Sequence, residues 1–395
     1  MKTKRVSLFM NAFKHPFLFL VAFLVGADEF LLGPILTPIG NDLGVVPERV
    51  TLFVTAYALP LALLAPLFGF LSDRHGRLAV LLPSTAVFAL ASVLTGFVSS
   101  FEWGIATRAL TGVASAGMLP IAFALAADES EEAAKSIAFV MSGLTTGLMA
   151  GPGLGAYLTE LWSWRAAFVA LGLAALAVGA IGPAVLRNGR RPERQRRTGP
   201  GGGRLLVPGT VGSLCGMFFG LGGAVGIYSL VGERLRDGLY LDTQQVGLVY
   251  VGFGVLSVAG NALAPAAIRR IGGGRRAMRL AMALVIVCLA VVFALPDPAL
   301  LAVVLALGVW AVAGGIGAPG LEAHIAGLSQ THRGVLLALS TSAANLGVAL
   351  SAALAGEAYL RGSLWVAGLG FVLLSISVMA LARPRGAASA TENAG

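Results

Sequence analysis

Charged residues are scarce in this chain. They make up 12% of its 395 residues, whereas soluble domains usually carry about 25%. The mean hydropathy is correspondingly high, at +0.84, and apolar runs of about 20 residues, the length that crosses a bilayer core, recur along the whole sequence. The lack of charge excludes a soluble globular protein and predicts an all-α protein that crosses the membrane many times.

Cysteine is rarer still. Cys215 and Cys288 both lie inside apolar runs, so they indicate neither a disulfide framework nor a metal site, and we interpret them as buried packing residues. A catalytic triad, a metal-ligating cluster and a phosphate-binding loop are also missing from the sequence. The glycines at 272–274 lie among arginines and follow no strand. We therefore expect no enzyme activity, no metal and no cofactor.

The apolar runs number twelve when the short polar connections are taken as their limits. Each is long enough to cross a bilayer as a helix. We expect membrane-spanning helices over residues 17–37, 50–71, 78–98, 103–127, 136–159, 165–186, 207–231, 245–268, 277–295, 300–321, 335–358 and 364–381.

The net charge of +9 would suit a nucleic-acid partner, but its placement argues against one. With the N-terminus inside, 22 of the 28 Lys and Arg fall on inner segments, which is the positive-inside pattern of membrane proteins. Acidic residues dominate only the inner segment 128–135, and they weigh little in this rule. The first apolar run contains two acids and lacks a small-residue cleavage site, so we expect a retained helix and not a signal peptide. We predict a multi-pass protein of the cell (inner) membrane with both termini in the cytoplasm.

One long polar segment, rich in Arg, Gly and Pro, separates six spans from six and is typical of a mobile linker. The two halves are weakly similar at a shift of about 190 to 200 residues, so that Gly147 aligns with Gly347. Internal repeats of this kind favour a substrate site between the halves. We predict two pseudo-symmetric six-helix bundles, 1–186 and 207–383, joined by a cytoplasmic linker, 187–206, and followed by a disordered tail, 384–395.

A charged island interrupts the apolar runs between the second and third spans. It reads Gly69-Phe70-Leu71-Ser72-Asp73-Arg74-His75-Gly76 and continues with Arg77. We expect a tight turn over these residues, with several charges at the mouth of a helix pair. In the second half Ala264 stands where Asp73 stands in the first, so we expect the first half to have kept the switch chemistry. The plain alternative is charge that only fixes the orientation of the loop.

Two acidic residues, Asp28 and Glu29, lie near the middle of the first span. Charge at that depth costs roughly 2.5–3.5 kcal/mol on insertion scales and is functional by default. Neighbouring residues on a helix point about 100° apart, so the two carboxyl groups cannot face the same way. Arg108 of the fourth span lies at a similar height, within about 5 Å. Either one acid carries a proton while Arg108 tunes it, or one acid simply pairs with Arg108; a carboxyl group held away from water can exchange protons near neutral pH.

Glycines recur every fourth residue in the fifth span, at Gly143, Gly147, Gly151 and Gly155. Small residues at this spacing share one helix face and permit close packing. Pro152 removes a helix hydrogen bond, and we expect it to bend the span at mid-height. We expect this face to turn toward the opposite half and to act as a hinge that seals the inner leak path; generic helix packing is the alternative.

These patterns together resemble the major facilitator superfamily and, within it, the twelve-span drug:proton antiporters. The island resembles the superfamily signature G-x-L-x-D-R-x-G-R, span four resembles R-x-x-x-G, and span five resembles the antiporter signature G-x-x-x-G-x-x-x-G-P-x-x-G. The matching residues are Gly69, Leu71, Asp73, Arg74, Gly76 and Arg77, then Arg108 and Gly112, then Gly143, Gly147, Gly151, Pro152 and Gly155, followed by the family-like opening of span six at 164–168.

The resemblance implies a transporter with the major facilitator fold that works by alternating access. It implies that the island is a latch of the outward-facing state, in which Asp73 lies near a helix N-terminus of the other half and Arg77 pairs with Asp128. It also favours Glu29, which is followed by Phe30, over Asp28 as the proton carrier. The implied latch residues are Gly69, Asp73, Arg74, Gly76, Arg77 and Asp128.

A few polar residues inside the spans are candidates for a substrate cavity, although hydrogen bonding between helices is the plainer interpretation of any one of them. They are Tyr57, Thr145, Thr146, Tyr228, Ser229, Tyr250 and Asn345. An apolar cavity with a single acid favours a lipophilic compound, neutral or cationic, over a sugar. We therefore expect proton-coupled export of a small amphipathic or drug-like compound by a monomer in contact with membrane lipids. The alternative is an exporter or uptake carrier for a sugar, an amino acid or a lipid-linked metabolite.

Overall fold

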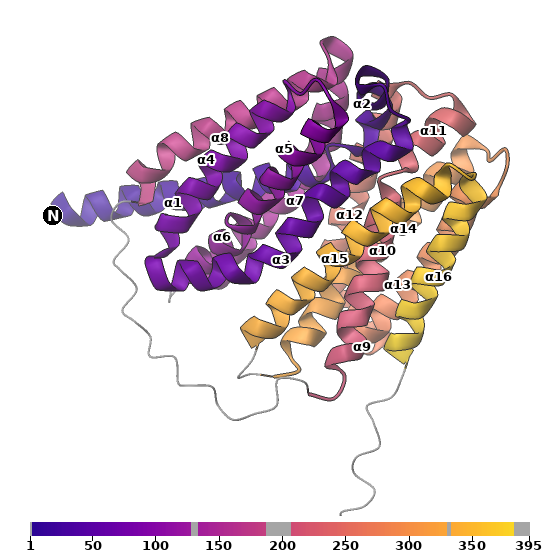
Figure 1. Cartoon of the computed structure of the whole chain (residues 1–395). Helices are drawn as coiled ribbons and strands as arrows, with labels where there is room; N and C mark the ends of the chain where they lie inside the picture. Colours follow the sequence, from indigo (N-terminus) through magenta and orange to yellow (C-terminus); the bar gives the residue numbers. More distant parts are fainter. Residues whose placement is uncertain (1, 128–132, 187–206, 330–332, 383–395) are drawn as a thin grey trace, which may run out of the picture.

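The computed structural model describes residues 2–127, 133–186, 207–329 and 333–382, and within these ranges the chain is helical and contains no strand. The predicted linker, the predicted tail and Asp128 lie outside the described residues. The helices form two groups (Figure 1). The first group comprises α1 (Lys2–Phe30), the 3₁₀ turn η1 (Gly33–Ile35), α2 (Leu36–Leu43), η2 (Pro47–Val50), α3 (Thr51–His75), α4 (Arg77–Thr95), α5 (Phe101–Ala116), α6 (Leu119–Ala127), α7 (Ala133–Leu161) and α8 (Trp164–Leu186).

The second group follows the same general plan, with two π-helical segments included. It comprises α9 (Thr210–Cys215), the π-helix η3 (Gly216–Gly222), α10 (Gly223–Tyr228), α11 (Val231–Leu239), α12 (Thr243–Ile271), α13 (Gly274–Leu289), the π-helix η4 (Ala290–Ala294), α14 (Leu300–Ala326), α15 (Arg333–Tyr359) and α16 (Ser363–Ala382).

Ten helical stretches of the described chain are long and apolar enough to cross a membrane, and α1 with α2 forms an eleventh if a bend of 42° is allowed. The remaining long helix is α7, with 29 residues. At about 1.5 Å per residue, it exceeds the roughly 30 Å of a bilayer core. Ten or eleven of the predicted spans are thus met by hydropathy and length, and α7 corresponds to the span expected over 136–159 by its length.

Two predicted spans end earlier than the apolar runs suggested. The span expected over 17–37 breaks after Phe30 and continues through η1 into α2, because Pro34 and Pro38 have no N–H to donate within a helix. The span expected over 207–231 ends at Tyr228, and α11 follows as a separate short helix. Both additional helices, α2 and α11, lie at the same side of the molecule (Figure 1).

The charged island is helical, whereas the sequence suggested a turn. Helix α3 continues to His75 and α4 begins at Arg77, so that only Gly76 lies between them. Gly76 has a φ of +102°, a conformation that glycine adopts without steric cost. The expected turn over 69–76 is therefore reduced to a single residue.

The internal repeat predicted from the sequence is visible in the packing. A Cβ atom on Gly147 would collide with the carbonyl oxygen of Phe23, and one on Gly347 would collide with that of Phe218. In each group the glycine-bearing helix, α7 or α15, therefore lies in backbone contact with the first spanning helix of its own group. The two groups repeat one packing arrangement, as pseudo-symmetric bundles do.

The two groups meet along α3 with α15 and along α7 with α12. We call the side where α3 ends and α9 begins the linker side, and the side that carries α2 and α11 the far side. Thr55 Oγ1 donates to the Ala349 carbonyl, and Ser342 Oγ to the Ala62 carbonyl, each at 2.8 Å. Among the described residues, every hydrogen bond between the groups lies either at the level of the Ser342–Ala62 bond or closer to the far side. Figure 1 shows the groups joined at α2 and α11 and separating toward the linker-side ends of α3 and α15.

Candidate functional site

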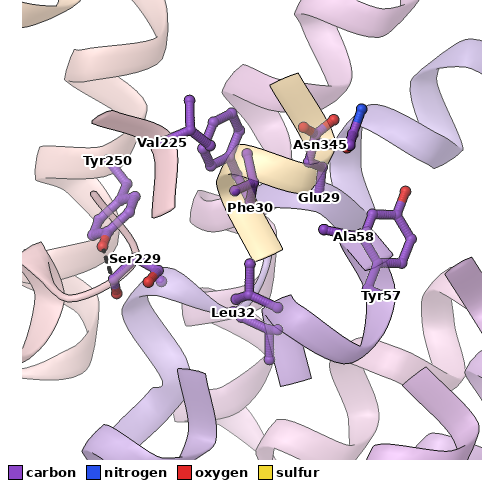
Figure 2. A pocket seen from close by; sticks show the side chains of 12 residues that line it. Glu29, Phe30, Leu32, Tyr57, Ala58, Val225, Ser229, Tyr250 and Asn345 are labelled. Carbon is purple, nitrogen blue, oxygen red and sulfur yellow. Dashed lines mark hydrogen bonds between the residues drawn. The ribbon is translucent and has the colours of Figure 1, made fainter. Parts of the chain in front are cut away.

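A cavity lies between the two groups at the level where α1 ends. It contains about 400 Å³ of space free of atoms, but the centre of a water molecule fits in only about 20 Å³ of it. The cavity is thus narrow in this conformation and must widen to hold a ligand of more than a few atoms. Its lining comes from both groups and comprises Glu29, Phe30, Leu32, Gly33, Val54, Tyr57, Ala58, Val225, Ser229, Tyr250, Asn345 and Val348 (Figure 2).

Asp28 forms a buried ion pair inside the first group. Arg108 Nη1 donates to Asp28 Oδ1 at 2.6 Å, and the two side chains are 1% and 0% exposed. The guanidinium of Arg108 also lies over the rings of Tyr57, at 4.8 Å, and Phe168, at 5.5 Å. Arg108 thus reaches the first span, as residue counts suggested, and of the two acids it is Asp28 that pairs with Arg108.

Glu29 lines the cavity instead (Figure 2). Its position one residue further along α1 turns its side chain by about 100° from that of Asp28. Within the described part of the chain, no group donates a hydrogen bond to the Glu29 carboxylate or forms an ion pair with it. The adjacent acids are therefore separated into one that is paired and one that faces the space between the groups.

The polar residues expected to line the cavity divide into two sets. Tyr57, Ser229, Tyr250 and Asn345 line it, whereas Thr145 and Thr146 donate to carbonyl oxygens of their own helix, at Met141 and Ser142, and do not line it. Tyr228 is absent from the lining, and its ring packs against that of Tyr250. Threonine hydroxyls commonly bond back to the carbonyl four residues earlier, so a threonine in a span is a weak signal of a cavity.

An aromatic cluster backs the cavity on the side of the second group. The ring of Tyr228 lies 4.2 Å from Phe253, 4.8 Å from Tyr250 and 5.7 Å from Trp310 between centroids. Phe30 of the first group meets Tyr228 edge-on at 5.5 Å. Rings at these distances and angles attract one another, so they build a rigid apolar wall opposite Glu29.

The glycine ladder of α7 packs against α1. Cβ atoms on Gly143, Gly147 and Gly151 would collide with the backbone of Phe19, Phe23 and Ala27, and one on Gly155 would lie 3.2 Å from Leu31. The ladder face therefore lies against α1 of its own group, whereas the sequence suggested that it faces the opposite half. Periodicity showed that these glycines share a face, but not which neighbour that face meets. The ladder holds the segment of α1 that carries Asp28 and Glu29, and helix α7 continues through Pro152.

The charged island lies on the linker side, and two of its charges, Asp73 and Arg77, pair with each other. Arg77 Nη1 lies 2.7 Å from Asp73 Oδ1 and 3.1 Å from Ser72 Oγ. Asp73 is 47% exposed, and a Cβ atom on Gly69 would have no neighbour within 4 Å. The island thus makes no close contact at Gly69 in this conformation. The expected partner Asp128 lies outside the described residues, so the latch, including Arg74 and Gly76, stays a prediction.

Sequence reasoning missed a second set of polar residues, on α11. Glu233 and Arg236 bond to Thr37 and Pro34 of the first group. Glu233 is 3% exposed, although it lies just after the apolar run 207–231. The signal was present as the segment VGERLRDGL, where two acids flank two arginines within a short amphipathic stretch.

Known proteins resemble the chain over most of its length. Residues 18–235 match the sequence profile of the Major Facilitator Superfamily. The chain is 24% identical over 384 residues to the uncharacterized MFS-type transporter YwfA of Bacillus subtilis, an alignment that covers 93% of this chain and 91% of YwfA. It is 29% identical over 156 residues to the multi-drug resistance efflux pump PmrA of Streptococcus pneumoniae, which covers 38% of this chain and 39% of PmrA. Among solved structures, a bacterial homologue of the human lysosomal transporter Spinster, inward-facing and unoccupied, superposes with a TM-score of 0.68 at 15% identity over 94% of each chain, which establishes similarity of fold alone.

Proposed function

Because the chain belongs to the major facilitator superfamily, we propose that it is a proton-coupled transporter that exports a small amphipathic compound by alternating access. The family and its transporter relatives make the protein a multi-span membrane transporter of small molecules, and not an enzyme. The proton, the direction and the substrate class are the proposal. Its main support is the unpaired carboxyl group of Glu29 in the cavity between the two bundles.

The two acids of α1 have different surroundings, and this supports different roles. Asp28 is held by Arg108 and is closed off from the cavity, so exchanging its proton would require the ion pair to break. Glu29 has no such partner and lies where an arriving substrate would lie. We assign the proton to Glu29, and to Asp28 and Arg108 the task of holding this part of α1 in place.

The cavity lining supports an amphipathic substrate. Most of it is aliphatic or aromatic, and the polar groups besides Glu29 are the phenols of Tyr57 and Tyr250, the amide of Asn345 and the hydroxyl of Ser229. A sugar would need many hydrogen bonds, and unmet ones in an apolar site cost affinity. A compound with an apolar body and one basic or hydrogen-bonding group fits this lining better.

Export by alternating access is supported by the arrangement of the two groups. The hydrogen bonds between them lie toward the far side, and the groups separate toward the linker side. We propose that the linker side faces the cytoplasm, because Lys and Arg concentrate there. The contacts between the groups then concentrate away from the cytoplasm, which suits an inward-facing state in which the cavity has still to widen for a substrate. The name of PmrA as an efflux pump and the glycine pattern of α7 favour export over uptake.

Transport in reconstituted vesicles tests the assignment. Purified protein in liposomes is given a pH gradient, and the accumulation of a fluorescent lipophilic cation is followed. We expect Glu29→Gln to lose gradient-driven accumulation while it retains exchange of labelled for unlabelled substrate without a gradient. Glu357→Gln is the matched control, because this carboxyl group is exposed at the far end of α15. Gradient-driven accumulation that persists in Glu29→Gln, Asp28→Asn and the double variant would refute the proton assignment.

A further inference from the structure

The far side of the molecule is closed by α11, which lies outside both neighbouring spans. Helix α11 contacts η1 and α2 of the other group (Figure 1). Its residues from Val231 to Leu235 are buried, and among them are the charged Glu233 and Arg234. Charged side chains are almost never buried unless they are paired, so the partners of these residues indicate what the helix does.

The proline break in the first group leaves backbone groups without helical partners. Pro38 has no N–H, so the carbonyl of Pro34, four residues earlier, lacks its usual donor. Thr37 belongs to the first turn of α2, whose N–H groups have no carbonyl partner within the helix. Ile35, the N-cap residue, provides no side-chain cap. The start of α2 thus presents a free donor and a free acceptor to the second group.

Side chains of α11 form hydrogen bonds with both of these backbone positions from across the interface between the helix groups. Glu233 Oε1 accepts from the Thr37 N–H at 3.1 Å, and Glu233 Oε2 lies 2.6 Å from Thr37 Oγ1. Arg236 Nη2 donates to the Pro34 carbonyl at 2.5 Å, and Arg236 Nη1 lies 3.2 Å from Glu233 Oε1. Helix α2 is therefore capped by residues of the opposite group.

The same contact extends to the cavity. A Cβ atom on Gly232 would collide with the Gly33 carbonyl, and one on Gly33 would collide with the ring of Tyr250. The Tyr250 hydroxyl accepts from the Gly232 N–H at 3.1 Å and donates to the Tyr228 carbonyl at 3.0 Å. Because Tyr250 also lines the cavity, the capping contact begins where the cavity ends on the far side.

We infer that Glu233 and Arg236 form the far-side gate of the transporter, holding it closed by capping α2 and releasing it when these bonds are exchanged for water. The inference rests on the alternating access of the proposed function, which requires the far side to open. Each bond that breaks is replaced by one to solvent, so the net stabilisation is modest. A modest stabilisation is what a gate that opens in every cycle requires.

The groups around Glu233 bear both signs of charge. They are Arg236 and Asp237 on α11, Glu48 on η2, and the phenols of Tyr250 and Tyr359. Burial raises the pKa of the Glu233 carboxyl above its ordinary value; the hydrogen bonds from Thr37 and the charge of Arg236 oppose this, while Asp237 and Glu48 add to it. In an open gate Glu233 would be in water with an ordinary pKa, so a proton binds more tightly to the closed gate.

Distances between spin labels on the two groups test the gate. The two natural cysteines are replaced, as Cys215→Ser and Cys288→Ala, and labels are placed at Asn41 and Tyr240, which are exposed at the ends of α2 and α11. In lipid nanodiscs we expect the unaltered gate to give mainly a short distance. Glu233→Ala should raise the ratio of long to short distances about tenfold, since the loss of a hydrogen bond to a charged group changes an equilibrium constant by about a factor of ten.

Controls separate the gate from a general loss of structure. Asp237→Asn alters the same helix, but its hydrogen-bond partner is the Tyr359 hydroxyl, at 2.8 Å within the same group, so the shift should be much smaller than that of Glu233→Ala. Glu233→Asp should restore part of the short distance. If Glu233→Ala does not fold, Thr37→Val removes one of the two bonds from the other side and should shift the ratio less. An unchanged distance in Glu233→Ala and Thr37→Val, or an equal shift in Asp237→Asn, overturns the inference. The distance between the spin labels does not depend on proton-driven flux. It would therefore still test the gate if the proposed proton coupling proved wrong.

Discussion

The buried ion pair between Asp28 and Arg108 makes a quantitative prediction about stability. Both side chains are shielded from solvent, with Nη1 and Oδ1 2.6 Å apart. The pair is incompletely satisfied, because Asp28 Oδ2 and Arg108 Nε have no hydrogen-bond partner among the residues that the structure describes. Removing one charge leaves the other buried without compensation, whereas replacing both with amides leaves two neutral groups that can bond to each other. The single and double variants should therefore differ strongly.

The expected size follows from burial. Breaking a buried ion pair by removing one partner costs roughly 3–5 kcal/mol. At about 2 cal/mol/K of unfolding entropy per residue, this lowers the melting temperature of the 395-residue chain by about 4–6 °C. Asp28→Asn should cost more than Arg108→Gln, because a carboxyl group left alone can take up a proton whereas a guanidinium cannot lose one. The double variant should recover most of the loss.

Thermal unfolding in detergent is measured for four purified proteins: the unaltered chain, the two single variants and the double variant, which together form a double-mutant cycle. The control pair is Asp42 with Arg165, which has the same 2.6 Å separation but side chains that are 45% and 32% exposed. Exposed pairs contribute about 0–1 kcal/mol, so the same substitutions there should show little coupling. Additive losses in the Asp28–Arg108 cycle, or equal coupling in the two cycles, would refute the reasoning from burial.

Three further predictions concern packing, the charged island and pH. Gly147→Val should abolish recovery of monodisperse protein in gel filtration, because the added carbons collide with the Phe23 carbonyl, whereas Gly252→Val, in open space, should be recovered normally. Arg77→Ala should leave membrane insertion unchanged but lower flux per inserted molecule if the island is a latch; unchanged flux would reduce the island to an orientation signal. Acid on the far side should raise the short-distance fraction between the labelled groups, because the raised pKa of Glu233 means that the closed gate binds the proton more tightly, and this advantage is lost as the pH rises through that pKa. Glu233→Gln should remove this pH dependence.

The candidate site was partly predictable. The cost of charge in a membrane singled out Asp28 and Glu29, and counting residues from the membrane surface placed Arg108 at the right height. Which acid pairs was beyond the sequence, because both lie within one helical turn of each other. Only the tertiary structure showed that the Arg108 guanidinium reaches α1 on the side of Asp28, leaving Glu29 toward the second group.

The gate residues could not have been found from local patterns. Glu233 and Thr37 are 196 positions apart, and neither belongs to a motif that the sequence analysis used. Their contact depends on two helix breaks, after Phe30 and after Tyr228, that fall at the same side of the molecule. The apolar runs continue through both breaks, so hydropathy alone extended the spans too far.

The sequence by itself determined the membrane-spanning class, the repeat and the faces that small or charged residues share. These properties depend on local composition and on the 3.6-residue helical period, which are written along the chain. The tertiary structure alone decided which helix each face meets: the ladder against α1, Asp28 against Arg108, Glu29 toward the cavity and Glu233 across to α2. Neighbours in space are chosen by packing between helices distant in sequence, and periodicity carries no information about the partner.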